Sequence, residues 1–264
     1  MKTVREIAAV RDALRGASSV GLVPTMGAFH AGHLALFAAA RAENDVVVAS
    51  LFVNPAQFGP GEDLAGYPRD EERDARVAER AGVDVLFVPE ADELYPDGYQ
   101  TWVDVEELSR RLEGEFRPGH FRGVATVCVK LFNIVKPQRA YFGQKDAQQA
   151  AVIKRLVADL NLNVTIRVVP TVRDEDGLAL SSRNAYLSAE EREKALALPR
   201  ALDAGLNAFF TGSDPAQEAS RFLNGLDVDY VDVADFDGQP VLAAAVRVGG
   251  TRLIDNVVLE GDKK

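Results

Sequence analysis

Two of the three histidines in this chain, His30 and His33, lie three residues apart in the stretch VPTMGAFHAGHLAL, residues 23 to 36. They follow an apolar run typical of a strand and fall at or just before the first turn of the helix predicted next. A helix N-terminus carries unpaired amides and the positive end of the helix dipole, both of which attract anions. Two imidazoles on one side of that turn therefore indicate a phosphate-binding site.

Histidines at this spacing have two other interpretations, which the residues alone leave open. They also cap or pack helix ends, and a pair of them also forms half of a zinc site. For zinc the only further histidine is His120, and the single cysteine, Cys128, is flanked by valines in a run typical of an inert core. We therefore predict no metal ion held by protein ligands alone.

The sequence contains neither of the glycine-rich phosphate motifs, GxxxxGK[ST] or GxGxxG. An anion must then be held by cations in loops beside the predicted strand and helix ends. The candidates are Arg69, Arg117, Lys145 and Arg183. Each of them taken singly is also consistent with an ordinary surface cation.

Polar residues near these cations have ordinary structural interpretations as well. Asp146 and Gln149 have the D-x-x-Q spacing of a capping box, a role that is compatible with ligand binding. Ser181 and Ser182 fit a turn, and the acidic run at residues 174–177 is typical of a solvated turn rather than a metal site.

The elements that must position these residues alternate along the first two thirds of the chain. Apolar runs predict strands at 19–24, 46–53, 83–88, 139–143 and 164–169, and helices are predicted at 33–44, 70–81, 124–135 and 147–160. Strands joined by crossover helices form a parallel, doubly wound sheet, which binds ligands beyond the carboxyl ends of its strands. We therefore predict a Rossmann-like α/β domain over residues 1–170, with its site in the loops after Val23, Val53, Tyr141 and Val169.

The pattern changes after Pro170. A capping box at Ser188 to Glu191 predicts a long helix to about Phe210, and the remaining runs alternate with period two around turns at Gly238 and Gly249. Residues 171–264 are therefore predicted to form a smaller α+β domain that acts as a lid.

The composition is that of an ordinary globular protein: 264 residues, of which 47% are hydrophobic and 27% charged. The net charge of −10 disfavours a nucleic-acid partner but allows a small anionic substrate in a cleft with a few cations. One cysteine excludes an internal disulfide, and no apolar run approaches the roughly 18 residues that a membrane span needs. We expect a cytoplasmic protein without a membrane or nucleic-acid partner.

Four motifs, in this order and spacing, carry a resemblance: PTMGAFHAGH, SLFVNPAQFGPGEDLAGYPRD, HFRGVATVCVKLFNIVKPQRAYFGQKDAQQ and PTVRDEDGLALSSRN. Together they resemble the pantoate-β-alanine ligase family over about residues 20 to 190. The His-x-Gly-His element alone marks only the wider nucleotidyltransferase superfamily that includes class I aminoacyl-tRNA synthetases. The resemblance implies that ATP activates pantoate as pantoyl adenylate, with release of pyrophosphate, and that β-alanine then displaces AMP. It also implies Mg²⁺ and a homodimer.

The resemblance implies roles for individual residues. The implied catalytic residues, which contact the ATP phosphates and the α-phosphorus, are His30, His33, Lys145, Ser181, Ser182 and Arg183. The last three would form a mobile loop that closes on the triphosphate. The further ATP contacts implied are Met26, Gly143, Asp146 and Val172.

The resemblance also implies a pantoate site. Its hydrogen-bonding residues would be Gln57 and Gln149, its apolar wall Pro24, Met26 and Phe58, and the arginine near the pantoate carboxylate Arg117. The chain departs from the family pattern at Ala147, commonly tyrosine, and at Leu180, commonly methionine. We interpret both as packing changes.

Three rival functions remain at this point. One is another small-molecule adenylyltransferase of the same superfamily, which would stop after transferring AMP. A second is a metallohydrolase that uses His30, His33 and His120 as zinc ligands. A third is a nucleotide-binding module without catalysis.

Overall fold

The computed structural model describes residues 1–236 and 238–260. Its internal contacts group the chain into two compact units. The N-terminal unit comprises residues 1–143 and 152–169, and the C-terminal unit comprises residues 144–151 and those from 170 onward. The division into domains at residue 170 stays a prediction, because contacts alone do not test independent folding.

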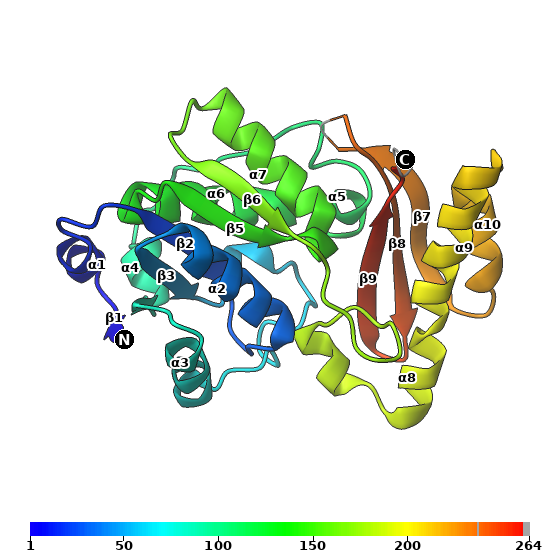
Figure 1. Cartoon of the computed structure of the whole chain (residues 1–264), viewed down its shortest axis with the longest axis horizontal. Helices are drawn as coiled ribbons and strands as arrows, with labels where there is room; N and C mark the ends of the chain where they lie inside the picture. The colour runs from blue at the N-terminus through cyan, green and yellow to red at the C-terminus, as the bar shows by residue number, and fades with distance from the viewer. Residues whose placement is uncertain (237, 261–264) are drawn as a thin grey trace. The chain divides into compact units, whose positions relative to one another are not determined.

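The N-terminal unit is built on a six-stranded sheet with the order β1-β4-β3-β2-β5-β6. Its strands are β1 (Lys2–Val4), β2 (Val20–Thr25), β3 (Val46–Leu51), β4 (Val85–Phe87), β5 (Arg139–Gly143) and β6 (Thr165–Val169). Every pairing in it is parallel, which confirms the predicted doubly wound α/β sheet (Figure 1). The short edge strand β1 was not predicted from the sequence.

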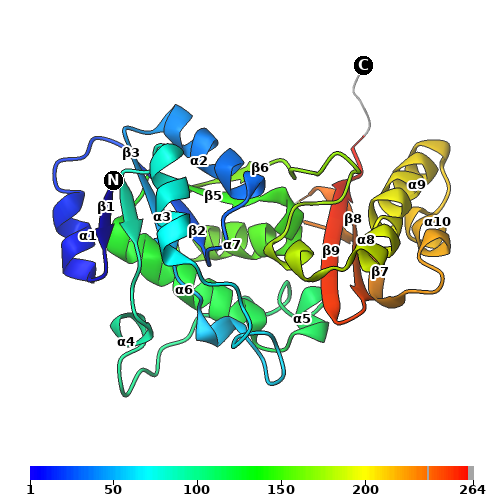
Figure 2. The same cartoon turned by 90° about the horizontal axis from the view of Figure 1, so that it is seen from below.

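Helices cover both faces of this sheet (Figure 2). One face packs against α1 (Ile7–Ala13), α6 (His120–Val135) and the part of α7 (Ala147–Asp159) that belongs to this unit, and the other packs against α2 (Ala31–Glu43) and α3 (Glu71–Arg80). The faces follow from the period of two in a strand: Leu22 of β2 joins the first cluster and Val23 the second. Cys128 of α6 lies in the first cluster, where burial raises the pKa of its thiol to about 12.

Short elements connect these helices and strands. They are the 3-10 helix η1 (Pro55–Gln57) and the helices α4 (Ala91–Leu94) and α5 (Glu113–Phe116). Helix α6 begins at His120, one turn earlier than predicted, because Gly119 takes a left-handed conformation with φ of 84° and starts the helix there.

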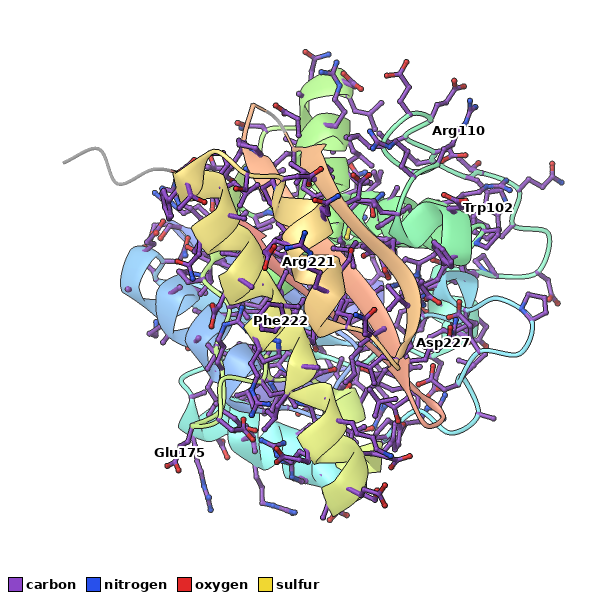
Figure 3. All side chains as sticks on the ribbon, turned by 90° about the vertical axis from the view of Figure 1, so that its right-hand side faces the viewer. Trp102, Arg110, Glu175, Arg221, Phe222 and Asp227 are labelled. Atoms are coloured by element: carbon purple, nitrogen blue, oxygen red, sulfur yellow. The ribbon has the colours of Figure 1, made fainter. Side chains whose placement is uncertain are left out.

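The C-terminal unit packs helices against a three-stranded antiparallel sheet, which confirms the predicted α+β class. The strands are β7 (Asp227–Asp235), β8 (Pro240–Val248) and β9 (Thr251–Val258), and the helices are α8 (Ala189–Ala195), α9 (Ala197–Thr211) and α10 (Pro215–Phe222). Figure 3 views this unit with Arg221 and Phe222 labelled on α10. Its core joins Leu198 and Leu202 of α9 to Leu242 of β8.

The single long helix predicted from Ser188 to about Phe210 is wrong. The capping box at Ser188 and Glu191 is present, but the chain breaks at Leu196 into α8 and α9. Pro199 explains the break, because it has no N–H to donate to the carbonyl of Ala195 four residues earlier. Among the described residues, no helix combines the length and the apolar character that crossing a membrane requires.

Candidate active site

The predicted histidine turn lies at the start of α2, directly after β2. His30 is the N-cap residue of α2, and its Nδ1 accepts a hydrogen bond from the backbone N–H of Gly32 at 3.1 Å. The Nδ1 of His33 accepts from the backbone N–H of His30 at 3.3 Å, and the two ring centroids are 4.2 Å apart. Since each Nδ1 is an acceptor, the proton of each neutral ring is on Nε2.

The capping and phosphate-binding interpretations of these histidines are therefore compatible. Capping uses Nδ1 of each ring, while an anion at the helix N-terminus would receive the Nε2–H groups. The arrangement joins two imidazole donors to the positive end of the helix dipole.

A buried carboxylate from α3 fixes the loop that leads into this turn. Asp74, whose side chain is 1% exposed, accepts hydrogen bonds from the backbone N–H groups of Ala28 at 2.6 Å and Phe29 at 2.9 Å. Ala28 is held at φ of 53°, an unusual conformation for a residue with a side chain. A Cβ at Gly27 would lie 2.6 Å from Leu51 Cδ1 and 2.9 Å from Asp74 Oδ2, so this loop requires glycine.

The sequence did not single out Asp74. It lies in EERDARVAER, where one acidic residue of a polar helix face resembles the next, and the partners in the loop are 45 and 46 residues earlier. No local signal marks which of these carboxylates is buried.

Gln57 lies in η1, and its amide orientation follows from its neighbours. The Oδ1 of Asn54 accepts from the Ala56 N–H at 3.2 Å, so its Nδ2 is the donor to the Oε1 of Gln57 at 2.9 Å. The NH₂ end of Gln57 is thereby assigned as the donor toward a ligand. The same Asn54 Nδ2 donates to the carbonyl of Gly123 at 3.2 Å.

Gly123 allows α6 to approach this segment closely. A Cβ at that position would lie 2.2 Å from the carbonyl oxygen of Ala56. Asn54 and Gly123 therefore support the segment that contains Gln57, and sequence reasoning missed them because their contacts arise from packing between η1 and α6.

Arg117 lies in the N-terminal unit with Glu62 as its ionic partner. Its Nε and Nη2 bind the two carboxylate oxygens of Glu62 at 3.0 and 2.6 Å, and Nη2 also donates to the carbonyl of Gln57 at 3.3 Å. The guanidinium therefore contacts the backbone of a predicted pantoate residue. Direct contact between Arg117 and the pantoate carboxylate stays a prediction.

His120 holds Gln57 from the other side. Burial, reinforced by the neighbouring Arg117, lowers the pKa of His120 to about 4, so the ring is neutral near pH 7. Its Nδ1 lies 2.9 Å from the Gln57 carbonyl and donates to it, while Nε2 accepts from Arg117 at 3.1 Å. Both ring nitrogens are thus occupied, which argues against His120 as a third zinc ligand. In the described part of the chain no group of three potential ligands is placed to hold a metal ion.

The remaining residues predicted in the N-terminal unit lie near the ends of β2, β3 and β5. Pro24 is in β2 and Met26 follows it, both half-buried, while Phe58 follows η1 and packs edge-on against Tyr67 at 5.9 Å. Gly143 is the last residue of β5. The candidate cation Arg69 instead donates to the Leu64 carbonyl of its own loop at 2.9 Å.

The C-terminal unit contains the predicted lysine turn. Lys145 lies in the 3-10 helix η2 (Gln144–Asp146), with its Nζ 3.4 Å from Asp146 Oδ1 and its side chain 19% exposed. Gln149 follows in the first turns of α7 and is half-buried. This segment directly follows Gly143 in the chain but groups by contacts with the C-terminal unit.

The loop after β6 contains the other predicted ATP residues. Val172 accepts from the Leu180 N–H at 3.0 Å, and the Ser181 Oγ accepts from the Arg183 N–H at 3.2 Å. Ser182 and Arg183 belong to the 3-10 helix η3 (Ser182–Tyr186). The predicted turn at Ser181 is therefore present, and its hydroxyl caps that helix.

The predicted site residues thus fall into two groups, one in each unit. All of them except Arg117, which lies between α5 and α6, are in β2 and β5 or in the segments that follow the four neighbouring strands β3-β2-β5-β6, and doubly wound sheets bind ligands beyond the carboxyl ends of their strands. The acidic run at residues 174–177 is a turn, with Gly177 at φ of 89° and Glu175 labelled in Figure 3.

Comparison with known proteins agrees with the four motifs. A family model described as pantoate-beta-alanine ligase matches residues 1–258. A pantothenate synthetase of Moorella thermoacetica is 54% identical, over 98% of this chain and 99% of that relative. The crystal structure of pantothenate synthetase from Thermus thermophilus matches 99% of this chain and 100% of its own with a TM-score of 0.95 and 48% identity.

A second solved structure was determined with ligands. It is pantoate-beta-alanine ligase from Francisella tularensis, complexed with beta-gamma ATP and beta-alanine. It is 35% identical, covers both chains completely and has a TM-score of 0.86. Because the family model matches residues 1–258 and relatives about 50% identical align with nearly all of the chain, this chain belongs to the pantoate-β-alanine ligase family.

Proposed function

We propose that this chain activates pantoate with ATP through the histidine turn of α2, and completes the reaction when β-alanine displaces AMP from the pantoyl adenylate. As a member of its family the chain is an ATP-dependent ligase that joins pantoate to β-alanine. The residue roles below are the proposal. The observation that carries it is the position of His30 and His33. The Nδ1 of each ring accepts a backbone hydrogen bond at the N-terminus of α2, the helix that follows the central strand β2.

In the first step the pantoate carboxylate attacks the α-phosphorus of ATP, a P–O bond to pyrophosphate breaks, and a mixed anhydride with AMP forms. Negative charge develops on the phosphate oxygens, and the Nε2–H groups of His30 and His33 would stabilise it together with the α2 N-terminus. Lys145 and the Ser181–Arg183 segment would bind the same triphosphate. No side chain of the protein needs to act as a nucleophile.

Gln57 is proposed to orient pantoate through its NH₂ group. An amide donor positions a carboxylate without the full positive charge that would weaken it as a nucleophile. Arg117 and His120 both contact the Gln57 carbonyl and would act on pantoate through it. Gln149, Pro24, Met26 and Phe58 complete the proposed pantoate set.

Mg²⁺ is proposed to enter bound to ATP. The acidic residue of the proposed ATP set is Asp146, which is paired with Lys145 rather than grouped with other carboxylates. Such a donor set fits an ion held mainly by phosphate oxygens, as Mg²⁺ commonly is. When bound, the ion neutralises phosphate charge.

In the second step the free amine of β-alanine attacks the acyl carbon, the C–N bond forms, and AMP leaves with the electron pair of the anhydride bond. The proton released from the attacking nitrogen passes to solvent. We also propose a homodimer in the cytoplasm, which light scattering and fractionation of the source cells would test.

One assay tests the whole proposal. ATP, Mg²⁺ and pantoate without β-alanine should give about one pyrophosphate per active site, and addition of β-alanine should then give AMP and an amide. An adenylyltransferase would release pyrophosphate without forming an amide, and a nucleotide-binding module would do neither.

Gln57→Ala should mainly raise the KM for pantoate; a change confined to the ATP dependence would contradict its role.

A further inference from the structure

The lysine turn is held by a residue from the other end of the chain, Asn256 of β9. The Nδ2 of Asn256 donates to the carbonyls of Gln144 at 2.9 Å and Lys145 at 2.8 Å, and its Oδ1 accepts from the Nε2 of Gln144 at 3.1 Å. These three hydrogen bonds use both protons and the oxygen of the amide. Asn256 is 4% exposed, so the bonds are shielded from water.

Asn256 lies on the face of β9 that does not pack against the hydrophobic core of the C-terminal unit. β9 is an edge strand of the sheet β7-β8-β9 (Figure 1). Successive side chains of a strand point to opposite faces of its sheet. Leu253 and Val257 point to the face that packs on the helices of the C-terminal unit, and Asn256 lies on the opposite face. Its side chain therefore contributes to the turn rather than to the packing of that core.

The preceding residue, Asp255, holds the second ATP segment of the same unit. Its carboxylate, buried with 0% exposure, binds the two terminal nitrogens of Arg173 at 2.5 and 3.0 Å. Arg173 in turn donates to the Gly177 carbonyl at 3.1 Å, within the loop that leads to the serines of the proposed site. Two adjacent residues of β9 thus fix both segments.

The turn is the three-residue 3-10 segment that joins β5 to α7. α7 continues it on one side, and the bonds from Asn256 hold the carbonyls of Gln144 and Lys145 at its start. The lysine side chain has four rotatable bonds, so the direction of its ammonium depends on a fixed backbone. Its contact with Asp146, at 3.4 Å, is too long to fix that direction alone.

We propose that Asn256 is a positioning residue for Lys145: it fixes the backbone of η2 and so the direction in which the ammonium meets the ATP phosphates. Asn256 itself touches no reacting atom. This inference rests on the proposed role of Lys145 and adds a residue on which that role depends.

The test compares the rates of pyrophosphate release by Asn256→Ala and Asn256→Asp at saturating ATP and pantoate. The Asp variant keeps the shape of the side chain but lacks the NH₂ group, so it carries the test if the Ala variant does not fold. Both variants should be slower by about tenfold, with the KM for pantoate changed less than about twofold. A rate within about twofold of wild type for both variants would overturn the inference.

A double-mutant cycle separates positioning from general damage. If Asn256 acts through Lys145, adding Asn256→Ala to Lys145→Ala should slow the reaction by less than about twofold further. An equal tenfold loss in both backgrounds would overturn the inference. If Lys145→Ala itself retains the wild-type rate, the proposed function of the lysine fails first.

Leu253→Ala is the matched control, since it lies in the same strand and leaves the contacts of Asn256 intact. It should lower the melting temperature as much as the Asn256 variants or more, because it leaves a cavity. Its rate of pyrophosphate release below that temperature should stay within about twofold of wild type. A tenfold loss for Leu253→Ala as well would show that destabilisation of the unit explains the result, and would overturn the inference.

Discussion

The two turns that are proposed to bind the ATP phosphates are anchored in different ways. The histidine turn caps itself, because His30 and His33 bind backbone groups two and three residues away at the start of a thirteen-residue helix. The lysine turn is a three-residue 3-10 helix that runs into the thirteen-residue helix α7, and its carbonyls are bound by Asn256, 111 residues after Lys145. One anchor is a local property of the sequence, and the other exists only after the C-terminal sheet has formed.

This difference affects what each turn tolerates. The cap of α2 is made by the two histidines themselves, and only the loop before it depends on the distant Asp74, whereas the lysine turn depends on β9 for the bonds to its carbonyls. We infer that changes in β9 reach the chemistry through the backbone of Lys145, whereas changes at Asp74 of α3 reach it through the loop before the histidines.

The largest effects should come from the two turns themselves. We expect His30→Asn and Lys145→Ala each to slow pyrophosphate release by about 10² to 10³, the range for loss of one transition-state donor. Asn is among the best N-cap residues, so His30→Asn should keep the cap and the thermal stability while losing the imidazole. Rapid-quench measurement of pyrophosphate and a thermal melt would check both parts.

Lys154→Ala is the control for the lysine, because it removes a cation from the same helix region outside the proposed site. Its rate should equal that of wild type. Retention of the wild-type rate by His30→Asn would mean that its ring serves only as a cap.

A smaller effect is expected at Asp74, the distant contact of the histidine turn. Asp74→Asn keeps one acceptor oxygen but leaves either the Ala28 or the Phe29 N–H without its partner. We expect the free energy of unfolding to fall by about 2 kcal/mol and pyrophosphate release to slow by about tenfold. Denaturant unfolding and the same quench assay would measure these changes.

Asp70→Asn is the matched control in α3, since its carboxylate only caps the helix at the Arg73 N–H and Asn caps nearly as well. Comparable losses in both variants would contradict the specific role of Asp74. If Asp74→Asn slowed pyrophosphate release more than His30→Asn does, the distant contact with Asp74 would matter more for the histidine turn than the cap made by the histidines.

Local patterns in the sequence predicted most strands and helices and placed the two histidines at a helix start, because each of these depends on residues close together in the chain. The parallel, doubly wound class of the sheet followed from the alternation of strands with helices. The break between α8 and α9 was missed although Pro199 signals it, because the capping box and apolar pattern dominated the interpretation.

The residues that hold the site could not be predicted in this way. Asn54, Asp74 and Asn256 are ordinary polar residues in the sequence, and each becomes important through partners that the fold brings close. Their signal is burial of a polar side chain with all its hydrogen bonds made, and burial depends on tertiary structure. The family resemblance supplied candidate ligand contacts but not these supporting residues.

His120 shows that the N-terminal unit also uses distant contacts, and its pKa makes the contact measurable. Its pKa falls from about 6.5 unfolded to about 4 in the folded protein, so the unfolded chain binds more protons between these values. Stability is therefore full above about pH 6.5 and is lost as the pH falls toward 4. We expect about 2 kcal/mol of loss from this group between pH 7 and pH 5.

Denaturant unfolding at both pH values would show the loss, and His120→Gln should remove that part of the pH dependence. The Gln side chain retains an NH₂ donor for the Gln57 carbonyl, so the variant is expected to fold. An unchanged pH dependence in His120→Gln would mean that other groups cause it. A reduced pH dependence in His120→Gln would show that the N-terminal unit contains a long-range contact with a measurable contribution to stability, in addition to the local cap made by His30 and His33.

The smallest effect is expected at Glu175, in the acidic turn between β6 and the serines of the proposed site. Its neighbours Asp174 and Asp176 are paired with Arg192 at 2.7 and 2.6 Å, so the turn is already balanced by a cation of α8. Glu175→Gln should leave pyrophosphate release and its Mg²⁺ dependence within about twofold of wild type, because an exposed carboxylate contributes little. A marked rise in the Mg²⁺ concentration required would instead make this turn part of the ion's site. The C-terminal unit would then contribute three segments to ATP binding: the lysine turn, the serine segment and the acidic turn. The N-terminal unit would contribute one, the histidine turn of α2, so the two units would differ more than the hydrogen bonds of β9 indicate.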